Sequence, residues 1–170
     1  MTHLLVDQLR FARAEFMRGF EGVSAEDATR RLGPMNCMSW IIAHLAYHEQ
    51  AYWLRIMNNP PAAPEVDEWA GYGRPASQPP LADALDAWRR VTAACDPFLD
   101  SLTSERLLEV PLRKGKPFSH NVGSMIQRVI YHYFYHTGEA QAIRQMLDHP
   151  GRPEYIGDIH LLAPYRAERS

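Results

Sequence analysis

The sequence predicts an all-α protein, a four-helix bundle with a long crossover loop and an irregular C-terminal tail. Three observations favour this fold class. Four long segments repeat apolar residues every three or four positions, and a Pro- and Gly-rich stretch separates the second segment from the third. The composition, 46% apolar and 22% charged over 170 residues, is typical of a soluble protein with a hydrophobic core. This length predicts a single domain over residues 1–170.

The first helix is predicted from one apolar stripe near the N-terminus. Its members recur at intervals of three and four residues: Leu5, Leu9, Ala12, Phe16 and Phe20. A short helix, "AEDATRRL", follows Ser24, which is a typical N-cap residue, and Gly33-Pro34 should end it. The second long helix is predicted over 38–57, with Asn36 as its cap. It is apolar around most of its circumference, so we expect it to be the most buried helix.

The stretch 58–80 is predicted to be a loop, because its Pro, Gly and Ala residues leave no helix or strand pattern. A loop this long in a compact domain is usually functional or disordered. Trp69 and Tyr72 favour packing of this loop over another part of the molecule. The third helix is predicted over about 81–102. One face of it carries Leu85, Trp88, Thr92, Cys95 and Leu99.

The remaining chain is predicted to contain one further long helix. A basic connector, "PLRKGKPFSHN", precedes it and is compatible with a turn or a short extended pair. The fourth helix should span about 122–148, with Asn121 as its cap. The tail after it, "GRPEYIGDIHLLAPYRAERS", has no clear period and is expected to lie across the bundle.

Composition also bears on location and partners. Eighteen basic and twenty acidic residues leave a net charge of −2, and no basic run marks a phosphate track, so a nucleic-acid partner is not expected. No uncharged stretch is long enough to span a bilayer, and the N-terminal residues do not form a signal peptide. Cys37 and Cys95 are too few and too isolated for a disulfide framework. A cytoplasmic protein without a membrane partner is predicted.

Histidines occupy core positions on two of the predicted helices. On the fourth helix the apolar stripe runs with spacings of 4, 3, 4, 4, 3 and 4 through Met125, Val129, His132, His136, Ala140, Ile143 and Leu147. Residues i and i+4 of a helix point the same way about 6 Å apart, a separation that one metal ion bridges. His44 and His48 repeat this spacing on the second helix.

Spacing alone leaves two interpretations of these histidines open. They are metal ligands, or they are core residues whose two ring nitrogens are satisfied by hydrogen bonds. Three neutral imidazoles suit Zn, Ni, Fe or Cu and leave a coordination position free for water or substrate. Glu49 and Glu139 either orient a ligand imidazole or lie on the surface, as glutamates at such positions more commonly do.

Three local patterns together resemble the DinB family, a group of DinB/YfiT-like four-helix-bundle proteins. "SWIIAHLAYHEQAYW" is similar to the family's second helix, which carries a single ligand histidine followed by aromatic residues. "YHYFYHTGEAQAIRQML" is similar to its closing helix, in which HxxxH continues as H-x-G-x-x-Q, and "YIGDIHLLAPYR" to the ending of longer members. The resemblance implies that His44, His132 and His136 bind the metal. Many members have Gln or His where this chain has Glu139, which bears on the reaction.

The resemblance also implies a function. DinB-like proteins bind divalent metals, here Zn or Ni in the first place and Fe or Mn after them, and often form homodimers. Some relatives are S-transferases that use bacillithiol or mycothiol, and one is a mycothiol-dependent maleylpyruvate isomerase. The sequence therefore predicts a metal-dependent transferase or hydrolase that activates a low-molecular-weight thiol, or water, against a small-molecule electrophile. His48 or Glu49 would carry the proton in catalysis, and His48 is alternatively an extra ligand or a hydrogen-bonding neighbour.

A substrate carboxylate would be bound by Arg55, Arg74 or Arg128, although solvent-facing arginines are more common than ligand-binding ones.

The alternative to an enzyme is a non-catalytic, stress-related binding or dimerisation module whose metal or histidine cluster is structural. A closed site with His48 as fourth ligand and no cavity would favour the module, whereas an open site beside a pocket would favour the enzyme.

Overall fold

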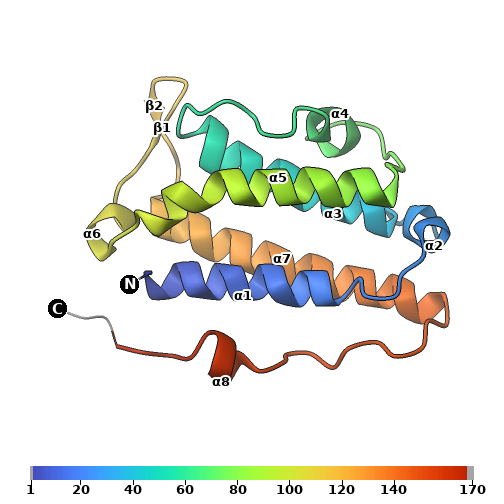
Figure 1. Ribbon diagram of the computed structural model, residues 1–170. Helices are drawn as coiled ribbons and strands as arrows, with labels where there is room; N and C mark the ends of the chain where they lie inside the picture. Colours follow the sequence, from blue (N-terminus) through green and yellow to red (C-terminus); the bar gives the residue numbers. More distant parts are fainter. Residues whose placement is uncertain (1, 168–170) are drawn as a thin grey trace.

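The computed structural model describes residues 2–167 and confirms the all-α bundle (Figure 1). The long helices are α1 (Leu4–Arg18), α3 (Met38–Glu49) with its π-helical continuation η1 (Gln50–Arg55), α5 (Leu81–Asp100) and α7 (Val122–Met146). The shorter elements are α2 (Ala25–Thr29), α4 (Val66–Ala70), α6 (Ser104–Leu107), β1 (Leu112–Arg113), β2 (Lys116–Pro117) and α8 (Ile159–Leu162). Within the described residues, no helix has the length and apolar character needed to cross a membrane.

The order of the long helices requires a long crossover connection. In Figure 1, α1 and α7 run in one direction and α3 and α5 run in the other. Because α5 alone has 20 residues and a helix of that length spans about 30 Å, the chain must return along the bundle between α3 and α5. Residues 56–80 make this return, so the predicted crossover loop is present. α3 packs against both α5 and α7, and α1 packs against α7.

The crossover is more ordered than predicted. Val66–Ala70 form α4, so the prediction that 58–80 contains no helix is wrong. Val66 and Ala70 are buried and α4 packs on α3, which stabilises a helix too short for its apolar period to stand out among prolines. Trp69 packs against the core as predicted. Tyr72 does not, because its side chain is 95% exposed.

Two of the three N-cap residues predicted from the sequence are confirmed. The Ser24 hydroxyl accepts a hydrogen bond from the Asp27 amide at 3.0 Å, and Asn121 Oδ1 accepts one from the Ser124 amide at 2.8 Å. The prediction for Asn36 is wrong, since the N-cap of α3 is Cys37 and no side chain caps that end. Asn36 lies one position too early for its side chain to reach the free amides of the first turn.

The second long helix changes character at Gln50. The sequence predicts one continuous helix over 38–57, but the turns after Glu49 are a π-helix. The Gln50 side chain bonds the backbone of Ala63 twice, donating to its carbonyl at 3.0 Å and accepting from its amide at 2.9 Å. These bonds tie the crossover to the helix. A π-turn inserts a single residue, so it leaves the apolar run intact and gives no local signal.

A buried ion pair lies inside the bundle. Arg13 of α1 donates to both oxygens of Glu49 of α3, one of these bonds being 2.9 Å long, and Glu49 is fully buried. Tyr133 donates to Glu49 Oε1 at 2.6 Å and accepts from the Trp88 indole at 2.8 Å. Burial alone would lower the pKa of Arg13, but the adjacent Glu49 carboxylate raises it above its ordinary value. Arg13 is therefore charged, and its hydrogen-bonded group with Glu49, Tyr133 and Trp88 links α1, α3, α7 and α5.

The connector and the tail complete the fold. The connector forms the antiparallel hairpin β1–β2, in which Arg113 faces Lys116, so the predicted extended pair is confirmed. The tail after α7 follows α1 lengthwise, with α8 in its middle (Figure 1). Gln8 donates to the Ala163 carbonyl at 2.7 Å, and Glu15 accepts from the Gly157 amide at 2.9 Å.

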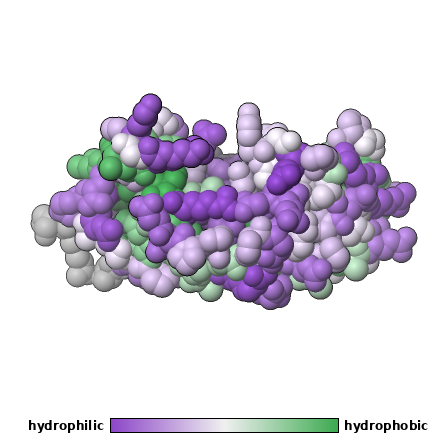
Figure 2. Space-filling model, turned by 90° about the horizontal axis from the view of Figure 1, so that it is seen from above, coloured by the Kyte–Doolittle hydropathy of each residue, from purple (hydrophilic) through white to green (hydrophobic). Residues whose placement is uncertain are grey.

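One end of the molecule carries exposed apolar side chains. The face seen in Figure 2 is mostly hydrophilic, with a hydrophobic area toward its left end, the end that carries α6 and the hairpin in Figure 1. Leu108 and Val110, between α6 and β1, and Leu112, the first residue of β1, are all exposed.

Candidate metal centre and cavity

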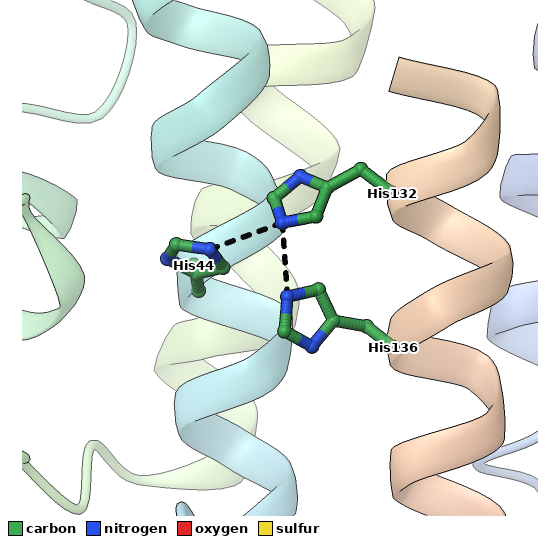
Figure 3. Close-up of side chains that lie close together, drawn as sticks. All are labelled: His44, His132 and His136. Carbon is green, nitrogen blue, oxygen red and sulfur yellow. Dashed lines mark hydrogen bonds between the residues drawn. The ribbon is translucent and has the colours of Figure 1, made fainter. Parts of the chain in front are cut away.

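The structure brings His44, His132 and His136 together between α3 and α7 (Figure 3). His132 and His136 lie one turn apart on α7, and His44 approaches them from α3. This arrangement follows from the packing of the two helices, because the spacing of four puts the α7 pair on the face that meets α3. The three predicted ligands thus form one group that could hold a metal ion.

The distances between the ring nitrogens match those between ligands of one metal ion. His132 Nε2 lies 3.3 Å from His44 Nε2 and 3.0 Å from His136 Nε2. One nitrogen of each ring lies within 4.8 Å of the others. A tetrahedral Zn²⁺ with bonds of about 2.0–2.1 Å separates its nitrogen ligands by about 3.3 Å. The geometry of the cluster fits a divalent cation.

The second nitrogen of two of these rings is held by an acceptor. His44 Nδ1 lies 3.3 Å from the Ala70 carbonyl at the end of α4, and His136 Nδ1 lies 2.7 Å from Glu139 Oε2. Both acceptors favour a proton on Nδ1, which leaves the lone pair on Nε2 facing the centre of the cluster. Glu139 therefore contacts a predicted ligand, as expected of a residue that orients an imidazole. The Ala70 carbonyl is a partner that depends on the fold of the crossover and could not be predicted from local sequence.

Hydrogen bonds among the imidazoles do not satisfy this cluster. With lone pairs on Nε2 of His44 and His136, only His132 has a proton to share, and it can serve only one neighbour. Nδ1 of His132 and Nδ1 of His48 are buried and have no hydrogen-bond partner among residues 2–167. Hydrogen bonds within the described residues therefore do not account for all the ring nitrogens, which argues against the interpretation as satisfied core histidines. A cation at the centre would use all three Nε2 lone pairs.

Burial keeps His44, His48 and His132 neutral, which is the state that binds metals. Desolvation, followed by repulsion from neighbouring imidazoles, lowers the pKa of His44 to about 4, of His48 to about 3 and of His132 to about 2. At neutral pH these rings carry no charge, so a metal does not have to displace a proton from them.

The metal-free protein is expected to lose stability as the pH falls from 6.5, the ordinary histidine value, toward 4, the pKa of folded His44. In this window the unfolded chain binds protons that the folded chain refuses, so a lower pH favours unfolding. Urea denaturation between about pH 7 and pH 5 measures the effect above the range of most carboxylates. His48→Leu should flatten the profile, and a wild-type stability that does not change in this range would contradict the pKa directions.

His48 lies beside the cluster and not in it. Its ring centroid is 4.4 Å from that of His132 and 4.5 Å from that of Tyr52, and it is not one of the three residues grouped around the candidate metal position. Glu49 faces the interior of the bundle, where Arg13 and Tyr133 occupy its oxygens. Its role as a proton carrier stays a prediction, which this placement does not favour.

A cavity of about 1560 Å³ opens next to the cluster. His44, His48 and His132 line one part of it, and it extends toward the hairpin between α3–η1 and α7. Such a volume admits a small substrate together with a thiol of moderate size. The candidate metal site therefore faces an accessible space.

The three arginines predicted to bind a substrate carboxylate differ in their position relative to the cavity. Arg128 and Arg55 line the cavity, but Arg55 forms an ion pair with Asp67. Arg74 is not among the lining residues. Arg113 and Lys114 of the hairpin line the cavity as well, and sequence analysis did not select them. The basic composition of the connector was the available signal, but its position over the cavity depends on tertiary structure.

Comparison with known proteins points to one family. A family model described as mycothiol-S-transferase matches residues 4–149. The match begins with α1 and ends just after α7, so it includes all four long helices and the three clustered histidines. No curated protein matches the chain.

Proposed function

The chain belongs to the mycothiol S-transferase family, one of the DinB/YfiT-like families, and from this premise we propose that it transfers a low-molecular-weight thiol to a small electrophile. Mycothiol is the first candidate thiol. His44, His132 and His136 would hold the divalent metal, with Zn or Ni preferred over Fe or Mn because a site of nitrogen ligands binds these later metals more tightly.

One observation carries the proposal: the cavity begins at the histidine cluster. His44 and His132 are shared between the cluster and the cavity wall, so a molecule in the cavity can reach the candidate metal position. The rival, a structural site in a non-catalytic module, calls for a fourth protein ligand and no adjoining space. His48 stands outside the group of three, and the adjoining space is large.

The chain's own residues would prepare the reaction. When bound, the metal would supply positive charge that lowers the pKa of a thiol, or of water in a hydrolase. Glu139 and the Ala70 carbonyl hold the imidazoles of His136 and His44 in orientation. In the transfer, the thiol sulfur forms a bond to the electrophilic carbon, the leaving group departs with its electron pair, and the thiol proton goes to solvent. The family match favours the thiol over water as nucleophile.

His48 is proposed as a neighbour of the reacting groups. Its ring lies in the cavity wall against His132, so it can contact a thiol or an electrophile held there. Its roles as extra ligand and as proton carrier stay predictions, as does the homodimer, which size-exclusion chromatography with light scattering would test.

Transfer of mycothiol to 1-chloro-2,4-dinitrobenzene is expected to depend on metal. Protein loaded with Zn or Ni should form the thioether well above the uncatalysed rate, and removal of the metal by a chelator should return the rate to background. Renewed addition of metal should restore it. Absorbance of the thioether product measures all three states. Turnover that survives complete metal removal would refute the mechanism.

A further inference from the structure

Three cations along the cavity have no carboxylate partner. Arg128 of α7 and Arg113 and Lys114 of the hairpin all line it, and within residues 2–167 none of them forms an ion pair. Arg55, the remaining arginine in the wall among the described residues, forms an ion pair with Asp67. We call Arg113, Lys114 and Arg128 the cation group.

The cavity wall is also free of negative charge among the described residues. Its lining contains no Asp or Glu. Neutral polar residues in the lining include Ser124, Gln127 and Asn58. Elsewhere on the described surface some arginines pair with carboxylates, as Arg10 does with Asp100 and Arg90 with Asp86. A concave surface with one sign of charge attracts ligands of the opposite sign.

Arg128 lies close to the candidate metal position. It is one helical turn before His132 on α7, a rise of about 6 Å along the axis. Arg128, His48 and His132 line the same cavity. A small molecule that contacts Arg128 can therefore also extend to the histidine cluster.

We propose that the electrophile carries a carboxylate, which Arg128 binds with the help of Arg113 and Lys114, while its reactive carbon points toward His132. This inference rests on the proposed transferase function and specifies its second substrate. A guanidinium matches a carboxylate through two parallel hydrogen bonds, so Arg128 would fix the orientation of the electrophile as well as attract it. Solvated surface cations would not discriminate between an acid and its amide.

Binding of two matched probes tests the proposal without catalysis. 3-Nitrobenzoate and 3-nitrobenzamide differ only in the carboxylate, and titration calorimetry gives both dissociation constants on metal-loaded protein. The wild type should bind the acid at least about tenfold more tightly, the low end of what a hydrogen bond to a charged group contributes. Equal affinities would overturn the proposal.

Variants assign the discrimination to the cation group. Arg128→Gln should bring the ratio of the two affinities close to one by weakening only the acid, and Arg113→Gln should reduce it in part. Arg89→Gln removes the same charge from an exposed position of α5 that does not line the cavity, and should leave the ratio unchanged. An Arg128→Gln protein that keeps the full preference, or weakens both probes equally, would remove Arg128 from the proposed role.

A reactive pair separates this inference from the proposed function. Mycothiol displaces chloride from 4-chloro-3-nitrobenzoate and from 4-chloro-3-nitrobenzamide: a carbon–sulfur bond forms, the carbon–chlorine bond breaks and the thiol proton goes to solvent. Each enzymatic kcat/KM is divided by the uncatalysed rate constant. A higher ratio for the acid supports both proposals. Equal ratios would refute the carboxylate preference but keep the proposed transferase function. Selective binding of the nitrobenzoate without any transfer would refute the transferase function but keep the anion site.

Discussion

His132→Ala is expected to abolish tight metal binding. His132 is the central member of the cluster, because its Nε2 lies within 3.3 Å of the ring nitrogen of both His44 and His136. Removing it leaves two imidazoles on different helices. Loss of a group that merely orients a ligand weakens binding roughly 10–100-fold, so loss of a ligand should weaken it by at least about 100-fold. Competition titration with a Zn indicator and elemental analysis measure affinity and stoichiometry.

Two comparisons make this result specific to the cluster. His160→Ala removes an exposed histidine of α8 and should leave one metal per chain. Glu139→Gln keeps the shape of the side chain that holds His136 Nδ1 at 2.7 Å, and should weaken binding by about 10–100-fold without changing stoichiometry. Metal bound at full stoichiometry by His132→Ala, or wild-type protein that takes up neither Zn nor Ni, would refute the site.

The sequence predicts this cluster better than it predicts the cavity. His132 and His136 are predictable because a spacing of four on one helix places two side chains on one face whatever else the chain does. His44 and His48 have the same spacing, so local pattern cannot choose between them. The choice depends on how far α3 slides along α7, and only the family resemblance indicated His44.

The features that sequence analysis missed depend on contacts between distant segments. The Ala70 carbonyl reaches His44 only because α4 packs on α3. Arg113 reaches the cavity only because the hairpin lies near η1, where Phe118, the residue after β2, packs on Tyr52. The sequence favours a catalytic or surface position for Glu49, since a charged residue is rarely buried without a partner. Its partner, Arg13, lies 36 positions away on another helix, and no local pattern connects the two.

Glu49→Gln is therefore expected to destabilise the protein by about 3 kcal/mol, and to do so without touching the metal site. Removing one partner of a buried ion pair leaves an uncompensated charge, which costs about 3–5 kcal/mol. Asp96, 3.0 Å from Arg13, offsets part of that charge, so the lower end of the range applies. Urea denaturation measures the free energy of unfolding. As a control, Asp100→Asn breaks the exposed pair with Arg10 and should cost no more than about 1 kcal/mol.

A double variant distinguishes the lost charge pair from lost packing. Arg13→Met combined with Glu49→Gln removes both charges, and Gln still offers an oxygen to the Tyr133 hydroxyl, which now donates to Glu49. If the uncompensated guanidinium causes the loss, the double variant should recover most of the 3 kcal/mol, because neutral replacements of a whole buried pair are often tolerated. A double variant less stable than Glu49→Gln would mean that Arg13 contributes mainly through packing. Unchanged metal affinity in Glu49→Gln would further separate Glu49 from the histidine cluster, whereas loss of metal would return it to the site.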